Sequence, residues 1–272
     1  MTIDPLTIDA CNPGPMTGAG NHTYLLVSGN KALLIDAGVG HPDHLAAIAR
    51  ALADNDAALT TVVVTHNHPD HATGVPALAA AFPRAVFAKF PWPDDVAPAG
   101  LRWRPLADGD HVPFGSDEVT AVYTPGHAPD HLALWHDPTR TLFSSDLVIA
   151  GSSVMIEASR GGNLSLYLHS LERMLELAPQ RLLPAHGPAI DDPTAVVRSY
   201  LEHRRRREQQ VIAALEAGHR SVEAIAESIY DGLEPRLMSA ARENVRAHLD
   251  KLVADGRAIV EGDRWRLQAW TR

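Results

Sequence analysis

Cysteine and long apolar runs are nearly missing from this chain of 272 residues. Its single cysteine, Cys11, cannot form an internal disulfide, and metal ligation by thiolates is not expected. No apolar run approaches the roughly 18 residues of a membrane-spanning helix, and residues 1–11 have neither the basic nor the apolar region of a secretory signal. These absences predict a cytoplasmic protein with no membrane partner.

Positive charge is also scarce, because 24 Lys and Arg face 33 Asp and Glu, which gives a net charge of -9. The whole surplus lies in residues 1–190, which hold 10 basic and 19 acidic residues. Divalent cations would neutralise part of it, but no basic field exists that would attract nucleic acid by counterion release. Nucleic acid is therefore not expected as a partner, although the sequence does not exclude it.

Short apolar runs and helical patterns make up the first two thirds of the sequence. From Thr23 onward, runs rich in Val, Leu, Ile and Tyr are typical of strands, and they read TYLLV, ALLID, TVVVT, AVFA, VTAVYT, HLALW and TLFSSD. Apolar residues three and four positions apart predict helices near 43–53, 69–80 and 164–177. Pro and Gly at 91–98 and 106–115 predict a long surface loop. The pattern indicates an α/β fold whose sheets are covered by helices.

The composition changes near Asp191, and a second unit begins there. Helices are predicted at about 194–217, 222–230 and 239–254, followed by a hairpin over RAIVEGDRWRL. Three helices and a hairpin are the outline of a winged helix. We therefore predict a catalytic domain over 1–193 and a small winged-helix-like domain over 194–272. This second domain is expected to pack on the first, shape its pocket or form a homodimer.

The segment Thr65-His66-Asn67-His68-Pro69-Asp70-His71 is the centre of the functional hypothesis. It places three imidazoles and a carboxylate within six positions behind an apolar strand, which a merely His-rich turn explains poorly. His66 and His68 project to the same side of an extended chain. Pro69 is suited to begin a helix, with Asp70 and His71 in its first turn. One loop could therefore serve two metal ions.

Three further strands end in residues suited to ligation. VYTPGHAPDH supplies His127, TLFSSD supplies Asp146 and RLLPAHG supplies His186. Ends of adjacent strands converge in space, so we expect all these side chains to meet. Five imidazoles and two carboxylates suit zinc best, and ligand type alone leaves iron and manganese open.

With these residues, the chain resembles the metallo-beta-lactamase-fold hydrolases, whose HxHxDH signature it carries intact. Within that superfamily it is most similar to the branch of beta-lactamase-like protein 2. The likeness is carried by NPGPMTGAGNHTYL, LLIDAG, TPGHAPDHLAL and LPAHGPAI, and by the tail SYLEHRRRREQQVIAAL before a winged helix. The resemblance implies an αββα sandwich followed by the small C-terminal winged-helix-like domain. It covers nearly the whole chain and is more specific for fold than for substrate.

The resemblance also implies how the residues share two metal ions. The first ion would be held by His66, His68 and His127. The second would be held by Asp70, His71 and His186, with Asp146 bridging both ions. Asp36 in LLIDAG falls where the superfamily has a supporting Asp, although a turn-capping role explains it equally well.

Two departures from the family pattern leave the specificity open. Gly20-Asn21-His22 stands where the family often has Gly-Thr-Asn. Ser144-Ser145-Asp146 stands where it often has Ser-Gly-Asp. Neither departure removes a ligand, but both lie near where a substrate would approach.

Such a centre has a definite chemistry. Two dications, two carboxylates and one bridging hydroxide leave a charge near +1, which favours substrates with an anionic or carbonyl group. A water shared by two cations ionises near neutral pH, and the cations polarise a carbonyl or phosphoryl oxygen. By the resemblance, Asp70 would orient the nucleophile and pass a proton to the leaving group.

Three functions compete at this point. The first is hydrolysis of a small ester, thioester, lactone or related acyl bond, which the acidic catalytic half favours. The second is an endoribonuclease or phosphodiesterase, which the family resemblance and bridged metal ions allow. The third is a nucleic-acid-binding regulator, but the presumed recognition helix sets Arg242, Arg246 and Lys251 against Glu243 and Asp250 and shows no basic stripe.

Several other polar residues are interpreted as structural. His41 and His44 are expected at a solvated helix start, and His131 in a buried hydrogen bond near the site. The run Arg204–Arg207 is expected on a solvated or salt-bridged helix face. Only His22 and Asn163 are kept as weak candidates for substrate contact. The remaining histidines are expected at the surface or in packing, and they are His111, His136, His169, His203, His219 and His248.

Overall fold

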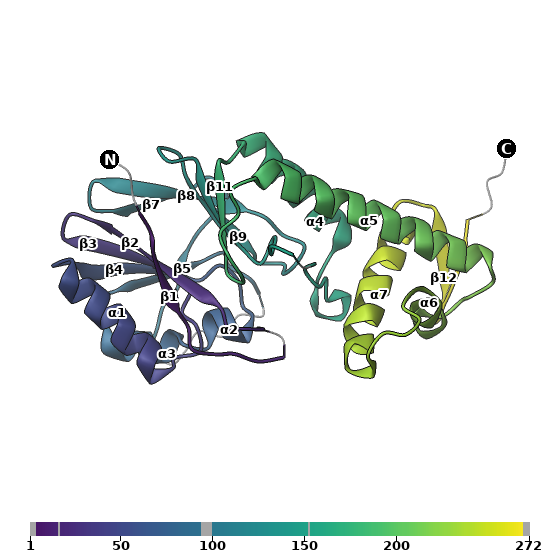
Figure 1. Cartoon of the computed structure of the whole chain (residues 1–272), viewed down its shortest axis with the longest axis horizontal. Helices are drawn as coiled ribbons and strands as arrows, with labels where there is room; N and C mark the ends of the chain where they lie inside the picture. Colours follow the sequence, from purple (N-terminus) through teal and green to yellow (C-terminus); the bar gives the residue numbers. More distant parts are fainter. Residues whose placement is uncertain (1–3, 16, 94–99, 152, 269–272) are drawn as a thin grey trace.

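The structure, a computed structural model, describes residues 4–15, 17–93, 100–151 and 153–268. Two sheets lie face to face between layers of helices, and the long helix α5 leads from this sandwich to a separate C-terminal unit (Figure 1). The predicted αββα sandwich with a C-terminal winged-helix domain is therefore confirmed.

The first sheet has six strands in the order β1-β2-β3-β4-β5-β6. The strands are β1 (Leu6–Asp9), β2 (His22–Ser28), β3 (Lys31–Ile35), β4 (Ala58–Val63), β5 (Val86–Lys89) and β6 (Arg104–Pro105). β3, β4, β5 and β6 pair in parallel, whereas β1 and β2 are antiparallel to their neighbours. Parallel pairing directs the carboxyl ends of β3, β4 and β5 to one edge of the sheet.

The second sheet has five strands in the order β11-β10-β9-β8-β7. The strands are β7 (His111–Phe114), β8 (Asp117–Tyr123), β9 (Leu132–His136), β10 (Thr141–Ser145) and β11 (Arg181–Pro184). β10 and β11 are parallel, and β8 runs in the same direction because two antiparallel pairings separate it from β10. The carboxyl ends of β8, β10 and β11 therefore share one edge.

Alternation along the strands builds the core on both faces of the first sheet. Along β2, Tyr24 and Leu26 face the second sheet, whereas Leu25 packs under the outer helices. Strand side chains alternate between faces, so a sheet that is covered on both sides reads as a continuous apolar run. This is why TYLLV and ALLID show no polar alternation.

Helices cover the outer face of each sheet. α1 (Pro42–Asp54) and α3 (Val75–Ala81) pack Ile48 and Leu78 against the first sheet. On the second sheet, α4 (Leu164–Leu177) and the first half of α5 (Pro193–Glu216) bury Leu171 and Tyr200. These helices fall close to where the periodicity of the sequence predicts them.

The C-terminal unit is built on the second half of α5. Its elements are α6 (Val222–Ile229), α7 (Met238–Ala254), β12 (Ala258–Glu261) and β13 (Arg264–Leu267). The short 3-10 helices η1 (Ala158–Arg160) and η2 (Pro235–Leu237) precede α4 and α7. Val211, Ile225, Leu249 and Trp265 form the centre of its own small core. The boundary of the two domains at 193 and 194 stays a prediction.

The structure corrects three expectations. The helix near 69–80 is interrupted after α2 (Pro69–Ala72). There the backbone of Gly74 lies against that of Ala37, and a Cβ on Gly74 would be 2.1 Å from the carbonyl oxygen of Ala37. The predicted loop at 106–115 contains β7, and residues 94–99 of the other loop lie outside the described residues. Arg204, expected on a solvated or salt-bridged face, is only 2% exposed because it lies between Val154 and Asn244 of α7.

Within the described part of the chain, none of the helices has both the length and the apolar character that a membrane span requires.

Candidate metal centre

The loop after β4 presents its side chains at the edge where both sheets end. The N–H of Leu132, at the start of β9, donates to the carbonyl oxygen of Thr65, which ties this loop to the second sheet. His68 is the N-cap of α2 and Pro69 is its first residue, so Asp70 and His71 lie in the first turn of the helix. Local sequence thus turns the chain from strand to helix within four residues of His66.

Asp146 and His186 follow two neighbouring parallel strands. β10 ends at Ser145 and β11 at Pro184, and these two residues are partners in the register. The N–H of Ala185 donates to the carbonyl oxygen of Ser145 at 3.1 Å. His127 lies in the loop after β8, at the same edge. The parallel alignment therefore brings together side chains that are far apart in the sequence.

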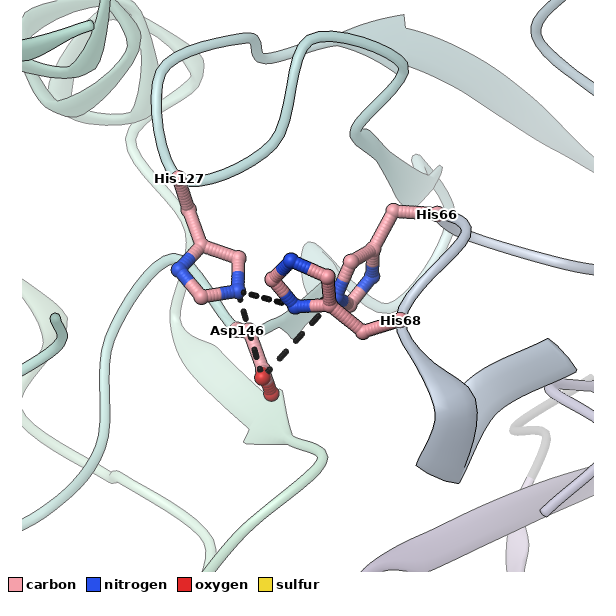
Figure 2. A group of neighbouring side chains, drawn as sticks. All are labelled: His66, His68, His127 and Asp146. Atoms are coloured by element: carbon pink, nitrogen blue, oxygen red, sulfur yellow. Dashed lines mark hydrogen bonds and ion pairs between the residues drawn. The ribbon is translucent and has the colours of Figure 1, made fainter. Parts of the chain in front are cut away.

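One group of four side chains consists of His66, His68, His127 and Asp146 (Figure 2). Nδ1 of His68 lies 3.0 Å from Nε2 of His66 and 3.0 Å from Nε2 of His127. Oδ2 of Asp146 lies 3.6 Å from Nε2 of His127 and 4.0 Å from Nε2 of His66. Three imidazole nitrogens and a carboxylate oxygen thus face a common point.

A second group consists of Asp70, His71, Asp146 and His186. Oδ2 of Asp70 lies 3.4 Å from Nε2 of His71 and 3.3 Å from Nε2 of His186. Asp146 contributes Oδ2 at 3.5 Å from Nε2 of His71 and Oδ1 at 3.4 Å from Nε2 of His186. The structure therefore brings all seven predicted residues together in two groups that share Asp146.

The donor set fits metal ions. In each group the ligand atoms lie within 4.8 Å of one another. Nitrogens about 2.0–2.1 Å from a tetrahedral zinc ion are separated by about 3.3 Å, close to the spacing around His68. Two buried atoms in the second group, Nε2 of His71 and Oδ1 of Asp146, make no hydrogen bond. Buried polar atoms normally have a partner, and a cation would provide one here.

The pKa values of the histidines shift in opposite directions in the two groups. Burial, together with neighbouring imidazoles, lowers the pKa of His66 well below its usual value and that of His68 to about 4. Burial would also lower the pKa of His186, but its contacts with the carboxylates of Asp146 and Asp70 raise it to about 10. The first group therefore presents neutral imidazoles, whereas the second holds protons that a dication would replace.

A set of hydrogen bonds around the groups was only partly foreseen. Asp36 forms a hydrogen bond with Nδ1 of His71. It therefore supports a residue of the second group, a role that the sequence left open. Oγ1 of Thr65 lies 3.0 Å from Nδ1 of His66 and 2.8 Å from Oγ of Ser145. Nδ2 of Asn21 donates to the carbonyl oxygen of Asp70 at 2.9 Å. Sequence reasoning missed Thr65, Ser145 and Asn21, although Thr65 directly precedes the motif and Asn21 and Ser145 lie in the two segments that depart from the family pattern.

The remaining candidates lie outside both groups. His131, as expected, is buried and lies 2.8 Å from Oγ1 of Thr124. His41 caps α1 and is exposed, but His44 is fully buried with Nε2 2.8 Å from Oγ1 of Thr23, so its solvated placement was wrong. Asn163 accepts from the N–H of Leu166 as the N-cap of α4, which gives its side chain a structural role.

Comparison with known families decides the class. The profile of the metallo-beta-lactamase superfamily matches residues 16–186, and that of the beta-lactamase associated winged helix domain matches 221–265. The chain belongs to the metallo-beta-lactamase superfamily. The resemblance drawn from the HxHxDH segment is thereby confirmed, and the family supports a metallo-beta-lactamase-fold hydrolase.

Matches to individual relatives of this superfamily member cover different shares of the chain. It is 33% identical over 273 residues to the beta-lactamase-like protein 2 homolog of Drosophila melanogaster, covering 96% of this chain and 91% of the relative. It is 34% identical over 206 residues to an atrochrysone carboxyl ACP thioesterase of Aspergillus chevalieri, covering 76% of this chain and 64% of the relative. The crystal structure of a beta-lactamase domain protein from Burkholderia ambifaria has 21% identity and a TM-score of 0.80, over 98% of this chain and 91% of that one, which shows the fold.

A cavity of about 380 Å³ lies between the segment after Asp146 and α5. Ile149, Tyr200, His203 and Arg206 are among its lining residues. None of the seven residues of the two groups lines it. The functional argument therefore rests on the two groups and not on this cavity.

Proposed function

We propose that this protein is a dinuclear metal-dependent hydrolase that cleaves a small acyl compound: an ester, a thioester, a lactone or a related bond. The observation that carries the proposal is the arrangement of two four-residue groups that share Asp146. A single structural metal site needs one such group, whereas a shared carboxylate fits two ions that act on one substrate.

The residues would divide between the two ions as their groups divide. His66, His68 and His127 would hold one ion, and Asp70, His71 and His186 the other, with Asp146 between them. Zinc suits this set of nitrogen and oxygen donors best, and iron or manganese would also fit. When bound, the two ions would supply Lewis acidity toward a carbonyl oxygen and would lower the pKa of a bound water.

Asp70 is the residue that we assign to proton transfer. Burial would raise the pKa of its carboxyl group, but its contacts with the rings of His186 and His71 keep it well below the usual range, so Asp70 is a carboxylate at neutral pH. Asn21 fixes the backbone of Asp70 through its carbonyl oxygen. A fixed carboxylate can orient the attacking water and carry its proton toward the leaving group.

Acyl chemistry is favoured over nucleic-acid chemistry. A relative with 34% identity is named as a thioesterase, which supports a thioester among the acyl substrates. The presumed recognition helix α7 is engaged within the chain, because Oε2 of Glu243 accepts from the N–H of Ser159 and Oδ1 of Asn244 accepts from Arg204. A helix that packs on its own catalytic domain is poorly placed to read a DNA groove.

The test is a turnover panel on protein of known metal content. The panel contains a thioester, a lactone, an aryl ester, a bis-aryl phosphodiester and single-stranded RNA. We expect acyl turnover that His68→Ala abolishes and that the matched variant His41→Ala, altered at an exposed helix cap, retains. Metal-dependent cleavage of RNA alone would replace this proposal with the nuclease.

Two further expectations accompany the proposal. The substrate is a small molecule with a carbonyl or anionic group, since the centre carries positive charge when loaded. A homodimer and a cytoplasmic location stay predictions, which a light-scattering mass and cell fractionation would check.

A further inference from the structure

The C-terminal domain contacts the catalytic domain directly behind His127. Nδ1 of His127 lies 2.9 Å from the carbonyl oxygen of Met155. A carbonyl only accepts, so Nδ1 must carry the hydrogen, and Nε2 of the neutral ring is left with its lone pair. Nε2 is the atom that faces His68 and Asp146. The Met155 carbonyl thus selects the ring form that can ligate a metal.

The segment that carries this carbonyl has no helix or strand of its own. Residues 153–157 precede η1 and form no ladder with either sheet. Val154 and Ile156 are nevertheless buried, at 3% and 0% exposure. Their backbone groups are held by side chains of α5 and α7 instead.

Two side chains of the last eighty residues provide this support. Nη2 of Arg204 donates to the carbonyl oxygen of Val154, and Nη1 of Arg204 donates to Oδ1 of Asn244 at 3.1 Å. Oδ1 of Asn244 also accepts from the N–H of Ile156 at 3.4 Å. The guanidinium of Arg204 lies 5.3 Å from the ring centroid of Tyr167 in α4, which fixes it further. Arg204 and Asn244 together hold the residues on both sides of Met155.

One peptide unit, between Met155 and Ile156, links Asn244 to His127. The carbonyl of Met155 and the N–H of Ile156 belong to the same planar peptide, in which they point in opposite directions. Asn244 binds one end of the unit, and His127 binds the other. A rotation of the peptide that releases Asn244 also turns the carbonyl oxygen away from Nδ1 of His127.

We propose that Arg204 and Asn244 are positioning residues for His127, through which the winged-helix domain sets metal affinity at the first of the two groups. The inference rests on the proposed metal centre. The inference also explains why Arg204 is buried, since its guanidinium binds the carbonyl oxygen of Val154, next to Met155. Partners of ligating histidines typically contribute about 10–100-fold to metal affinity or activity.

The experiment titrates the metal-free full chain with Co²⁺ and follows both equivalents by absorption and calorimetry. His127→Ala identifies the equivalent that depends on His127. Asn244→Leu is expected to weaken that same equivalent by about 10–100-fold and to leave the other unchanged. Asn244→Asp, which keeps an oxygen for Ile156 and Arg204, is expected to bind like the parent. Arg257→Ala, which removes an ion pair with Glu208 within the C-terminal unit, is the matched control.

A second readout does not depend on metal. Nitrogen NMR of His127 in the metal-free chain should show the Nδ1–H form in the parent and a mixture of both forms in Asn244→Leu. Should Asn244→Leu not fold, Arg204→Lys keeps the charge, loses the two-pronged contact, and should change both readouts in the same direction.

Two results would overturn the inference. In one, Asn244→Leu binds both equivalents as the parent does; in the other, it weakens both equally while lowering the unfolding temperature. If only His127→Ala loses an equivalent, the positioning role fails and the metal centre stands. If His127→Ala also binds like the parent, the proposed function fails as well.

Discussion

Oδ2 of Asp36 lies 2.8 Å from Nδ1 of His71, and Oδ1 of the same carboxylate accepts the N–H of Thr65 at 2.8 Å. One buried side chain, 2% exposed, therefore fixes both the loop before His66 and the ring of His71. Asp36 adopts a left-handed backbone with φ 68°, which Asp and Asn tolerate better than other side chains.

Asp36→Asn should disable His71 as a ligand without disturbing the turn. The amide can still accept from Thr65, but its NH₂ group would face Nδ1 and favour the ring form with hydrogen on Nε2, the atom that faces Asp70. Metal affinity of one equivalent should fall by about 10–100-fold, measured by calorimetry. Asp43→Asn, at an exposed position of α1, is the control, and equal affinities in the two variants would contradict the role of Asp36.

Asp70→Asn tests the proton-transfer role apart from metal binding. With metal content at two ions per chain, kcat on the best acyl substrate should fall by about 100- to 10,000-fold, the usual contribution of a general acid or base. The pH profile of kcat should also become flatter, because the variant lacks the ionising group that shapes it. Undiminished turnover with both ions present would remove Asp70 from the mechanism.

His44 should make the metal-free protein less stable in acid. Burial lowers its pKa from 6.5 to about 4, so between these values the unfolded chain binds a proton that the folded chain does not. Stability that is present above about pH 6.5 is therefore lost as the pH falls toward 4, by up to about 3 kcal/mol. His44→Gln should flatten this dependence, measured by urea unfolding at several pH values. His41→Gln should not, and parallel curves for parent and His44→Gln would refute the assignment.

Truncation should distinguish the two halves of α5. Val197, Tyr200 and Leu201 belong to the core of the catalytic domain, and the hydroxyl of Tyr200 bonds both the N–H and the carbonyl oxygen of Ile149. A chain that ends at residue 193 should therefore unfold at a markedly lower temperature than one that ends at 217, by circular dichroism. Equal unfolding temperatures, or full activity of the shorter chain, would show that α5 contributes nothing to the catalytic domain.

Much of the candidate site could be predicted because its signal is local. The HxHxDH segment concentrates ligand side chains within six residues, and the apolar run Val62–Val64 lies just before it. His127, Asp146 and His186 could be added because each follows an apolar run. Helix α4 matches its predicted bounds, 164–177, because its periodicity is undisturbed and Asn163 caps it.

Other features carried no such signal. His44 resembled a solvated helix start, since nothing in its neighbourhood reveals that Thr23, twenty-one residues away, lies against its ring. Arg204 stands in a run of four arginines, and nothing in that run reveals that Arg204 binds Val154 of the catalytic domain and Asn244 of α7. Met155 supports His127 through a backbone carbonyl, which every residue possesses.

The sequence by itself determined which residues could ligate metal and where most strands and helices lie, because side-chain chemistry and hydrophobic periodicity are properties of short stretches. Only the tertiary structure decided which oxygen of Asp146 faces each ring, that Asp36 meets His71, and that α5 and α7 hold the peptide behind His127. These relationships depend on the order of the strands in the sheets and on the docking of one domain on another. Both are set by the packing of residues distant in the chain.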